Sequence, residues 1–155
     1  MRTAGTWSRR LAVFVVVALV CAFVAALSAG ATVTSGATVK TRTTSLGKIV
    51  VNASGRTLYL FEADKHGKSA CYGQCAKFWP PLLTSGKPVA GPGVKAKLLG
   101  VTMRKNGKHQ VTYGGHPLYR YSNDEKAGQT EGEGLKAFGA GWDVVAPSGK
   151  KIDKS

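Results

Sequence analysis

The chain contains an internal repeat, and this repeat constrains the fold more than any other feature. The segment "LYLFEAD" at residues 58–64 returns as "LYRYSND" at residues 118–124, at an offset of 60 positions, and the match extends back to Gly47 without a gap. A second pair, "WPPLLTSGK" from Trp79 and "WDVVAPSGK" from Trp142, follows in the same order. Self-similarity of this kind indicates that one supersecondary unit occurs twice.

The second copy shows the strand pattern of this unit. The segment "LLGVTMR" precedes Asn106-Gly107, a strong hairpin signal, and "KHQVTY" then leads to a second turn at Gly114-Gly115 before "PLYRYS". Three short strands joined by tight turns predict an antiparallel β-meander. The segments that begin at Trp79 and Trp142 are expected to add a short fourth strand to each copy, since "WDVVAP" is rich in β-branched residues.

We therefore predict a mainly β fold. Two similar antiparallel β-meander repeats, at about 41–87 and 101–150, are expected to pack as one compact sandwich or barrel-like domain over residues 45–150. A short helical turn is expected near residues 69–78, where "SACYGQCAKF" interrupts the strand pattern. The chain length favours a single folded domain.

The repeated motif places aromatic residues on one face of a strand. Alternate side chains of a strand share a face, so Tyr59 lies with Phe61, and Tyr119 lies with Tyr121. We expect this face to form the core between the copies, because buried aromatic rings supply large contact areas. The motif residues, for which a structural or a binding role is predicted, are Tyr59, Phe61, Asp64, Trp79, Tyr119, Tyr121, Asp124 and Trp142.

The two aspartates of the motif have two interpretations. In the structural one, Asp64 and Asp124 accept hydrogen bonds from a Tyr hydroxyl or from N–H groups of the turns that they open. In the alternative, a twofold packing of the copies brings Glu62, Asp64, Asp124 and Glu125 together to bind a cation or a basic ligand. Repeated sequence normally encodes repeated architecture, which favours the structural interpretation.

The N-terminal segment predicts export. Arg9 and Arg10 precede an uncharged apolar run at residues 11–27, and Ala29-Gly30-Ala31 fits a cleavage site of small residues. This order is typical of a secretory signal peptide over residues 1–31. The alternative is an uncleaved membrane anchor through residues 11–27, because the run reaches the lower length limit for a spanning helix.

Composition indicates how the domain is bounded. Residues 32–44, "TVTSGATVKTRTT", are rich in Thr, Ser, Gly and Ala, and they are predicted to form a flexible linker. Residues 151–155, "KIDKS", are predicted to form a short basic tail after the last repeat. The protein is therefore expected outside the cell or associated with the cell envelope.

Charge is strongly positive and unevenly placed. The chain has a net charge of +14, and removal of residues 1–31 leaves 19 basic against 8 acidic residues. No acidic residue lies between Asp64 and Asp124, where ten basic residues occur. In an exported protein such a charge favours anionic cell-wall polymers or a membrane surface as partners, or simply keeps the domain soluble. No nucleic-acid-binding motif is present, and no specific nucleic acid is predicted as a partner.

The cysteines of the predicted domain are Cys71 and Cys75, in "CYGQC". Two cysteines in an exported domain predict one disulfide. The alternative is a copper-handling or thiol-redox protein, in which Cys71 and Cys75 with His66 or Met103 hold Cu(I), a soft ion that favours sulfur ligands.

No pattern of catalytic residues is visible in the sequence. The chain lacks a nucleophile elbow, a zinc-protease helix, a phosphate-binding loop and a dinucleotide fingerprint. We therefore predict that the protein is not an enzyme and needs no cofactor. Its expected role is that of a binding or structural module.

The combination of motifs resembles that of a bacterial family of secreted proteins and predicted lipoproteins with a Yx(F/W/Y)xxD motif. The matching features are the two motif copies, the connector with Cys71 and Cys75, "FWPPLL" and "GWDVVAPSGK", over about residues 45–150. The resemblance implies an exported, envelope-associated protein of uncharacterised activity, and it transfers no catalytic residue. Unlike the lipoprotein members, this chain lacks a standard lipobox, since Cys21 follows Val20 inside the apolar run.

Overall fold

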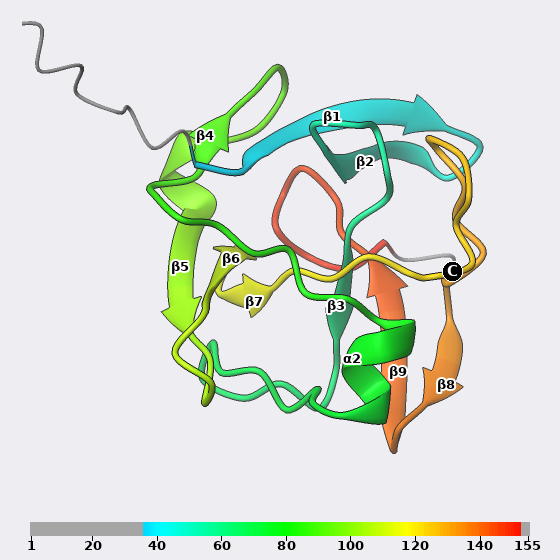
Figure 1. Cartoon of the computed structure of the whole chain (residues 1–155). Helices are drawn as coiled ribbons and strands as arrows, with labels where there is room; N and C mark the ends of the chain where they lie inside the picture. The colour runs from blue at the N-terminus through cyan, green and yellow to red at the C-terminus, as the bar shows by residue number, and fades with distance from the viewer. Residues whose placement is uncertain (1–35, 153–155) are drawn as a thin grey trace, which may run out of the picture. The chain divides into compact units, whose positions relative to one another are not determined.

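The computed structural model describes residues 36–152, and these residues form a mainly β fold (Figure 1). By its internal contacts, the segment 34–155 is one compact unit. Its elements, in chain order, are β1 (Thr38–Thr44), β2 (Gly47–Asn52), β3 (Tyr59–Phe61), α2 (Gln74–Phe78), β4 (Val89–Ala90), the 3-10 helix η1 (Ala96–Leu98), β5 (Leu99–Met103), β6 (His109–Tyr113), β7 (His116–Pro117), β8 (Leu135–Ala137) and β9 (Ala140–Val144).

The strands of residues 36–152 form three small sheets and no closed barrel. The strand orders are β2-β1-β4, β3-β9-β8 and β5-β6-β7. All pairs within them are antiparallel except β1 with β4, which run parallel. The predicted mainly β class with two repeats is thus confirmed, with three short sheets as its actual arrangement.

Most of the predicted linker that lies within the described residues is a strand, which corrects that boundary. β1 covers Thr38–Thr44 and pairs along its length with β2, from Val39 opposite Asn52 to Thr44 opposite Gly47. The side chain of Val39 is fully buried. Threonine is common in linkers, but its β-branched side chain also suits a strand. The signal peptide and the possible anchor at residues 11–27 lie outside the described residues.

The second repeat forms the predicted meander. β5 and β6 pair across the turn at Asn106-Gly107, and β6 and β7 pair across Gly114-Gly115. Gly107 has φ 76°, and Gly114 and Gly115 have φ 59° and 83°. Positive φ is available to glycine without the clash that a Cβ would cause, so these turns follow from local sequence.

The first repeat departs from a self-contained meander, because its third strand joins the other copy. β3 pairs with β9, and Tyr59 lies opposite Val144. The equivalent pairing in the other direction joins Tyr119 to Pro81 as an isolated bridge. In each copy, the segment that begins at the tryptophan therefore pairs with the aromatic strand of the other copy.

The segment that begins at Trp79 does not form the predicted fourth strand of the first copy. α2 ends at Phe78, and between it and β4 the chain makes isolated bridges at Pro81 and Leu83. Pro80 and Pro81 lack the N–H group that a regular ladder needs, which explains the difference from Trp142 in β9. The helical turn expected near residues 69–78 is present as α2.

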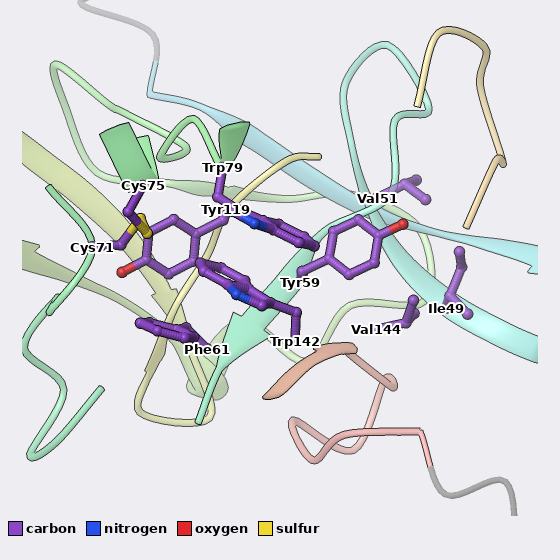
Figure 2. Close-up of a cluster of buried hydrophobic side chains, with 10 residues drawn as sticks. All are labelled: Ile49, Val51, Tyr59, Phe61, Cys71, Cys75, Trp79, Tyr119, Trp142 and Val144. Atoms are coloured by element: carbon purple, nitrogen blue, oxygen red, sulfur yellow. A yellow bond between two sulfur atoms is a disulfide. The ribbon is translucent and has the colours of Figure 1, made fainter. Parts of the chain in front are cut away.

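Buried side chains form two hydrophobic clusters. The central cluster gathers residues of both repeats and is drawn in Figure 2: Ile49, Val51, Tyr59, Phe61, Cys71, Cys75, Trp79, Tyr119, Trp142 and Val144. A second cluster holds the opposite faces of the same strands, including Leu58, Leu60 and Leu118. Both faces of the motif strand are thus buried, although Arg120 is exposed.

Candidate functional site

The motif residues meet at the centre of the domain, where each tyrosine binds the aspartate of the other repeat. The hydroxyl of Tyr59 donates to Oδ2 of Asp124 at 2.6 Å, and the hydroxyl of Tyr119 donates to Oδ2 of Asp64 at 2.8 Å. Both tyrosines are fully buried, and Asp124 is only 1% exposed. The motif therefore joins the two copies by a reciprocal exchange of hydrogen bonds.

The second carboxylate oxygen of each aspartate closes a connector. Oδ1 of Asp64 accepts the N–H of Ala70 at 2.8 Å, and Oδ1 of Asp124 accepts the N–H of Glu131 at 3.0 Å. Aspartate commonly holds a loop in this way through the backbone that follows it. Each aspartate thus has both kinds of partner considered from the sequence, a Tyr hydroxyl and a backbone N–H.

The two Tyr–Asp pairs point away from each other. The backbones of Tyr59 and Tyr119 pair at the centre, with N–H to C=O distances of 2.9 and 3.0 Å. From there the rings run in opposite directions, and their hydroxyls lie at opposite ends of the cluster (Figure 2). Residues 36–152 contain no group of three or more His, Cys, Asp or Glu side chains placed to hold a metal ion. The alternative of a shared carboxylate site gains no support from this arrangement.

Four rings form a stack between these tyrosines. Trp79 and Trp142 lie parallel with ring centroids 3.9 Å apart. The outer face of each tryptophan is covered by an aromatic ring from the other repeat. Phe61 stacks on Trp142 at 4.1 Å, and Tyr121 stacks on Trp79 at 4.4 Å. The edges of Tyr59 and Tyr119 meet this stack, at 5.3 Å from Trp79 and 5.2 Å from Trp142. All eight motif residues are therefore in one assembly.

Burial governs the electrostatics of the Tyr–Asp pairs. Desolvation raises the pKa of Asp64 and Asp124 above the ordinary value, although their hydrogen bonds oppose the shift. Desolvation also raises the pKa of Tyr59 and Tyr119, and the nearby carboxylates add to that shift. The hydroxyls thus stay protonated and donate at neutral pH, which is the state that the two bonds require.

A buried arginine, which the sequence analysis did not single out, extends one of the two pairs. Arg104 is 4% exposed, and its guanidinium donates to Ser69 Oγ at 2.8 Å and to the Cys71 carbonyl at 2.6 Å. Ser69 Oγ lies 2.8 Å from the Tyr119 hydroxyl, and Gln110 Oε1 accepts a further bond from Arg104. The first repeat has a threonine at the equivalent position, so the repeat pattern carried no signal for this residue.

The predicted disulfide is confirmed. Cys71 and Cys75 are bonded to each other, with a Cα–Cα distance of 5.2 Å, and both are buried in the central cluster. The bond does not by itself indicate a redox role. His66 is exposed, and Met103 is 62% exposed. Because Cys71 and Cys75 are bonded to each other, the four residues considered for Cu(I) do not include a free thiol pair in this structure.

One long stretch of the chain has no acidic residue. Residues 65–123 hold ten basic and no acidic residues, and all the basic ones except Arg104 are exposed. This range, which we call the acid-free segment, includes the sheet of β5, β6 and β7 and the turn at Lys105 to Lys108. Within residues 36–152, no helix is long and apolar enough to cross a membrane.

Comparison with known proteins identifies the family. The model of a family described as a secreted repeat of unknown function matches residues 40–83 and 100–146, which together are more than half of the chain. No curated protein and no solved structure matches this chain. The two matched segments each contain one copy of the Tyr–Asp motif. This chain therefore belongs to the family of secreted repeats of unknown function.

Proposed function

We propose that this protein is a non-enzymatic module of the cell envelope that binds anionic wall polymers through its acid-free segment. The observation that carries the proposal is the separation of charge along the folded chain. Nine exposed basic side chains fall within residues 65–123, and no carboxylate of that range offsets them. An exported protein with such a surface attracts polyanions from the wall around it.

The positions of the acidic residues strengthen this surface charge. The carboxylates of Asp64 and Asp124 accept hydrogen bonds from Tyr hydroxyls in the core. Glu62 is exposed, but its Oε1 is paired with Lys151 at 2.7 Å. These three carboxylates therefore have partners within the domain, and they compete weakly with a polyanion for the exposed lysines.

The absence of a catalytic role for the motif is part of the proposal. Catalytic groups must reach a substrate, whereas the motif tyrosines are fully buried and their hydroxyls are bonded to the aspartates. The stacked tryptophans are also buried. These contacts support a role for the motif in building the domain rather than in chemistry.

Lys105 and Lys108 offer the sharpest test, because both are exposed at the turn between β5 and β6. We would measure retention of residues 34–155 on purified poly(glycerol phosphate) wall polymer while the salt concentration rises. Salt should elute the domain, since screening weakens attraction between exposed charges. The paired change Lys105→Glu and Lys108→Glu should lower the eluting salt concentration clearly.

The matched control is Lys48→Glu with Lys126→Glu, which changes the charge equally at exposed positions outside the acid-free segment. This control should retain most of the binding. Equal loss in both variants would assign the effect to net charge alone and would contradict a binding surface on the acid-free segment. Retention that does not respond to salt would also contradict the proposal. Far-ultraviolet circular dichroism establishes that each variant is folded.

A further inference from the structure

Two phenylalanines on different repeats form an exposed aromatic pair. Phe78, the last residue of α2, is 48% exposed, and Phe138, in the turn between β8 and β9, is 47% exposed. Their ring centroids are 6.1 Å apart. Large apolar side chains that gather on a surface commonly mark a site of interaction. In Figure 1 the turn between β8 and β9 stands at one end of the domain, with α2 close by.

The backbone of Phe138 is in an unfavourable conformation. Phe138 has φ 56° and Gly139 has φ 91°, and together they connect Ala137 and Ala140, the last pair of the β8–β9 ladder. A two-residue turn of this hand strongly prefers Asn-Gly, because a bulky side chain is strained at positive φ. Strain that a small residue would remove is a reason to look for a function of the phenyl ring.

Three exposed lysines either line a hollow with Phe138 or precede Phe78 in sequence. Phe138 lines a surface hollow of about 770 Å³, together with Lys65 and Lys136. Lys77 directly precedes Phe78, and all three lysines are exposed. Glu62 also lines the hollow, but its carboxylate is paired with Lys151. We call Phe78, Phe138 and these three lysines the aromatic tip.

We propose that the aromatic tip inserts its two phenyl rings into the interface of an anionic phospholipid bilayer. An exposed aromatic pair accompanied by lysines matches such an interface, where the rings leave water and the ammonium groups meet lipid phosphates. The tip shares Lys65, Lys77 and Phe78 with the acid-free segment but lies apart in sequence from Lys105 and Lys108. Vesicle binding and wall binding are therefore tested with separate variants.

The test is flotation of residues 34–155 with vesicles. This segment is a compact unit with both hydrophobic clusters inside it, so it can be studied without residues 1–33. The domain should float with vesicles of equal parts phosphatidylglycerol and phosphatidylcholine, and not with phosphatidylcholine alone. Each change, Phe78→Ser or Phe138→Ser, should weaken binding about tenfold, as expected from the loss of half a phenyl burial.

Two further variants separate insertion from folding. Val101→Ser removes a side chain that is 44% exposed on β5, and it should leave vesicle binding unchanged. Phe138→Asn suits the left-handed turn, so it should raise the melting temperature while it weakens vesicle binding. A gain in stability with a loss of binding is a result that a purely structural role of Phe138 does not produce.

Three outcomes would overturn the inference. The first is that the domain with both Phe78→Ser and Phe138→Ser binds vesicles as strongly as the unchanged domain. The second is equal binding to vesicles with and without phosphatidylglycerol, which would remove the role of the lysines. The third is loss of binding to poly(glycerol phosphate), but not to vesicles, on Phe138→Ser, which would assign the aromatic tip to the wall polymer.

Discussion

At the scale of single residues, the repeated motif makes two hydrogen bonds. Each bond joins the tyrosine of one copy to the aspartate of the other. Tyr59 and Tyr119 bring buried hydroxyls into the core, and a buried hydroxyl without a partner is costly. Asp124 and Asp64 supply those partners and also close their own connectors through a backbone N–H. The residue types of the motif are explained by this double use of each carboxylate.

Tyr59→Phe tests the bond directly. The change leaves Oδ2 of the buried Asp124 without its Tyr donor, so we expect a loss of about 1–3 kcal/mol in the free energy of unfolding. Urea denaturation followed by tryptophan fluorescence measures this loss. The matched control is Tyr121→Phe, because among residues 36–152 the hydrogen bond of the Tyr121 hydroxyl is with the exposed Asn123 amide, at 3.2 Å. It should change the stability by less than about 0.5 kcal/mol, and a similar loss in both variants would contradict the assignment.

The same hydroxyls predict a fall of stability at alkaline pH. Burial raises the pKa of Tyr59 and Tyr119 above the ordinary value of 10.0. The unfolded chain therefore releases these protons at lower pH than the folded domain does. The contribution of the two hydroxyls to the free energy of unfolding is complete below pH 10, and it is lost as the pH rises through the pKa of the folded state. Each tyrosine adds a slope of about 1.4 kcal/mol per pH unit. Urea titrations between neutral and strongly alkaline pH should show a shallower fall for Tyr59→Phe, and unchanged slopes would contradict the prediction.

At the scale of elements, short segments depend on contacts outside themselves. α2 has only five residues, and its first turn has no side-chain cap. Such a helix is not stable alone, because nucleation costs more than one turn regains. The disulfide between Cys71 and Cys75 and the packing of Trp79 in the central cluster hold it in place.

Removal of the disulfide should have a moderate effect. The bond closes a loop of five residues, for which chain entropy gives about 2 kcal/mol. Cys71→Ala with Cys75→Ala should lower the free energy of unfolding by about this amount, and reductant should lower that of the unchanged domain similarly. Urea denaturation with and without dithiothreitol measures both. A variant that remains as stable as the unchanged domain would show that packing, not the bond, holds α2.

The elements also show where sequence patterns are sufficient. The turns at Asn106-Gly107 and Gly114-Gly115 and the strands on either side of them were predictable, because the required φ angles favour glycine locally. β1 was not recognised in full, since a run of threonines suits a strand and a linker alike. What decides for a strand is the pairing with β2 and β4, and only the folded chain shows that pairing.

At the scale of the whole molecule, the two repeats are interlocked. β3 of the first copy pairs with β9 of the second, and the stack of rings alternates between segments of both copies. A single copy would expose the faces of Trp79 or Trp142 and leave one tyrosine without its aspartate. The domain is therefore a single folding unit, although its sequence contains two similar repeats.

Separated halves should not fold alone. We expect fragments 34–93 and 94–155 to show little regular structure by circular dichroism when they are measured individually, because neither contains the complete central cluster. An equimolar mixture should regain the signal and the buried tryptophan fluorescence, since the pairing of β3 with β9 is between fragments. Cooperative unfolding of one fragment by itself would contradict this prediction. The intact segment 34–155 is the control.

The two surfaces proposed for binding were only partly visible in the sequence. The absence of acids between Asp64 and Asp124 is a property of the linear chain, so the acid-free segment could be recognised before the fold. The burial of Arg104 could not, because its partners Ser69 and Cys71 are distant in sequence. The aromatic tip could not be recognised either, since Phe78 and Phe138 meet only when the two connectors fold side by side.

The sequence by itself determined the repeat, the turns, the disulfide pair and the aromatic core, because each of these depends on neighbouring residues or on the identity of a side chain. Only the tertiary structure decided which tyrosine meets which aspartate. Both copies contain both residues, so a bond within a copy and a bond between copies use the same pair of residue types. The choice depends on which strands lie side by side, and here the pairing of Tyr59 with Tyr119 and of β3 with β9 directs each hydroxyl to the other repeat.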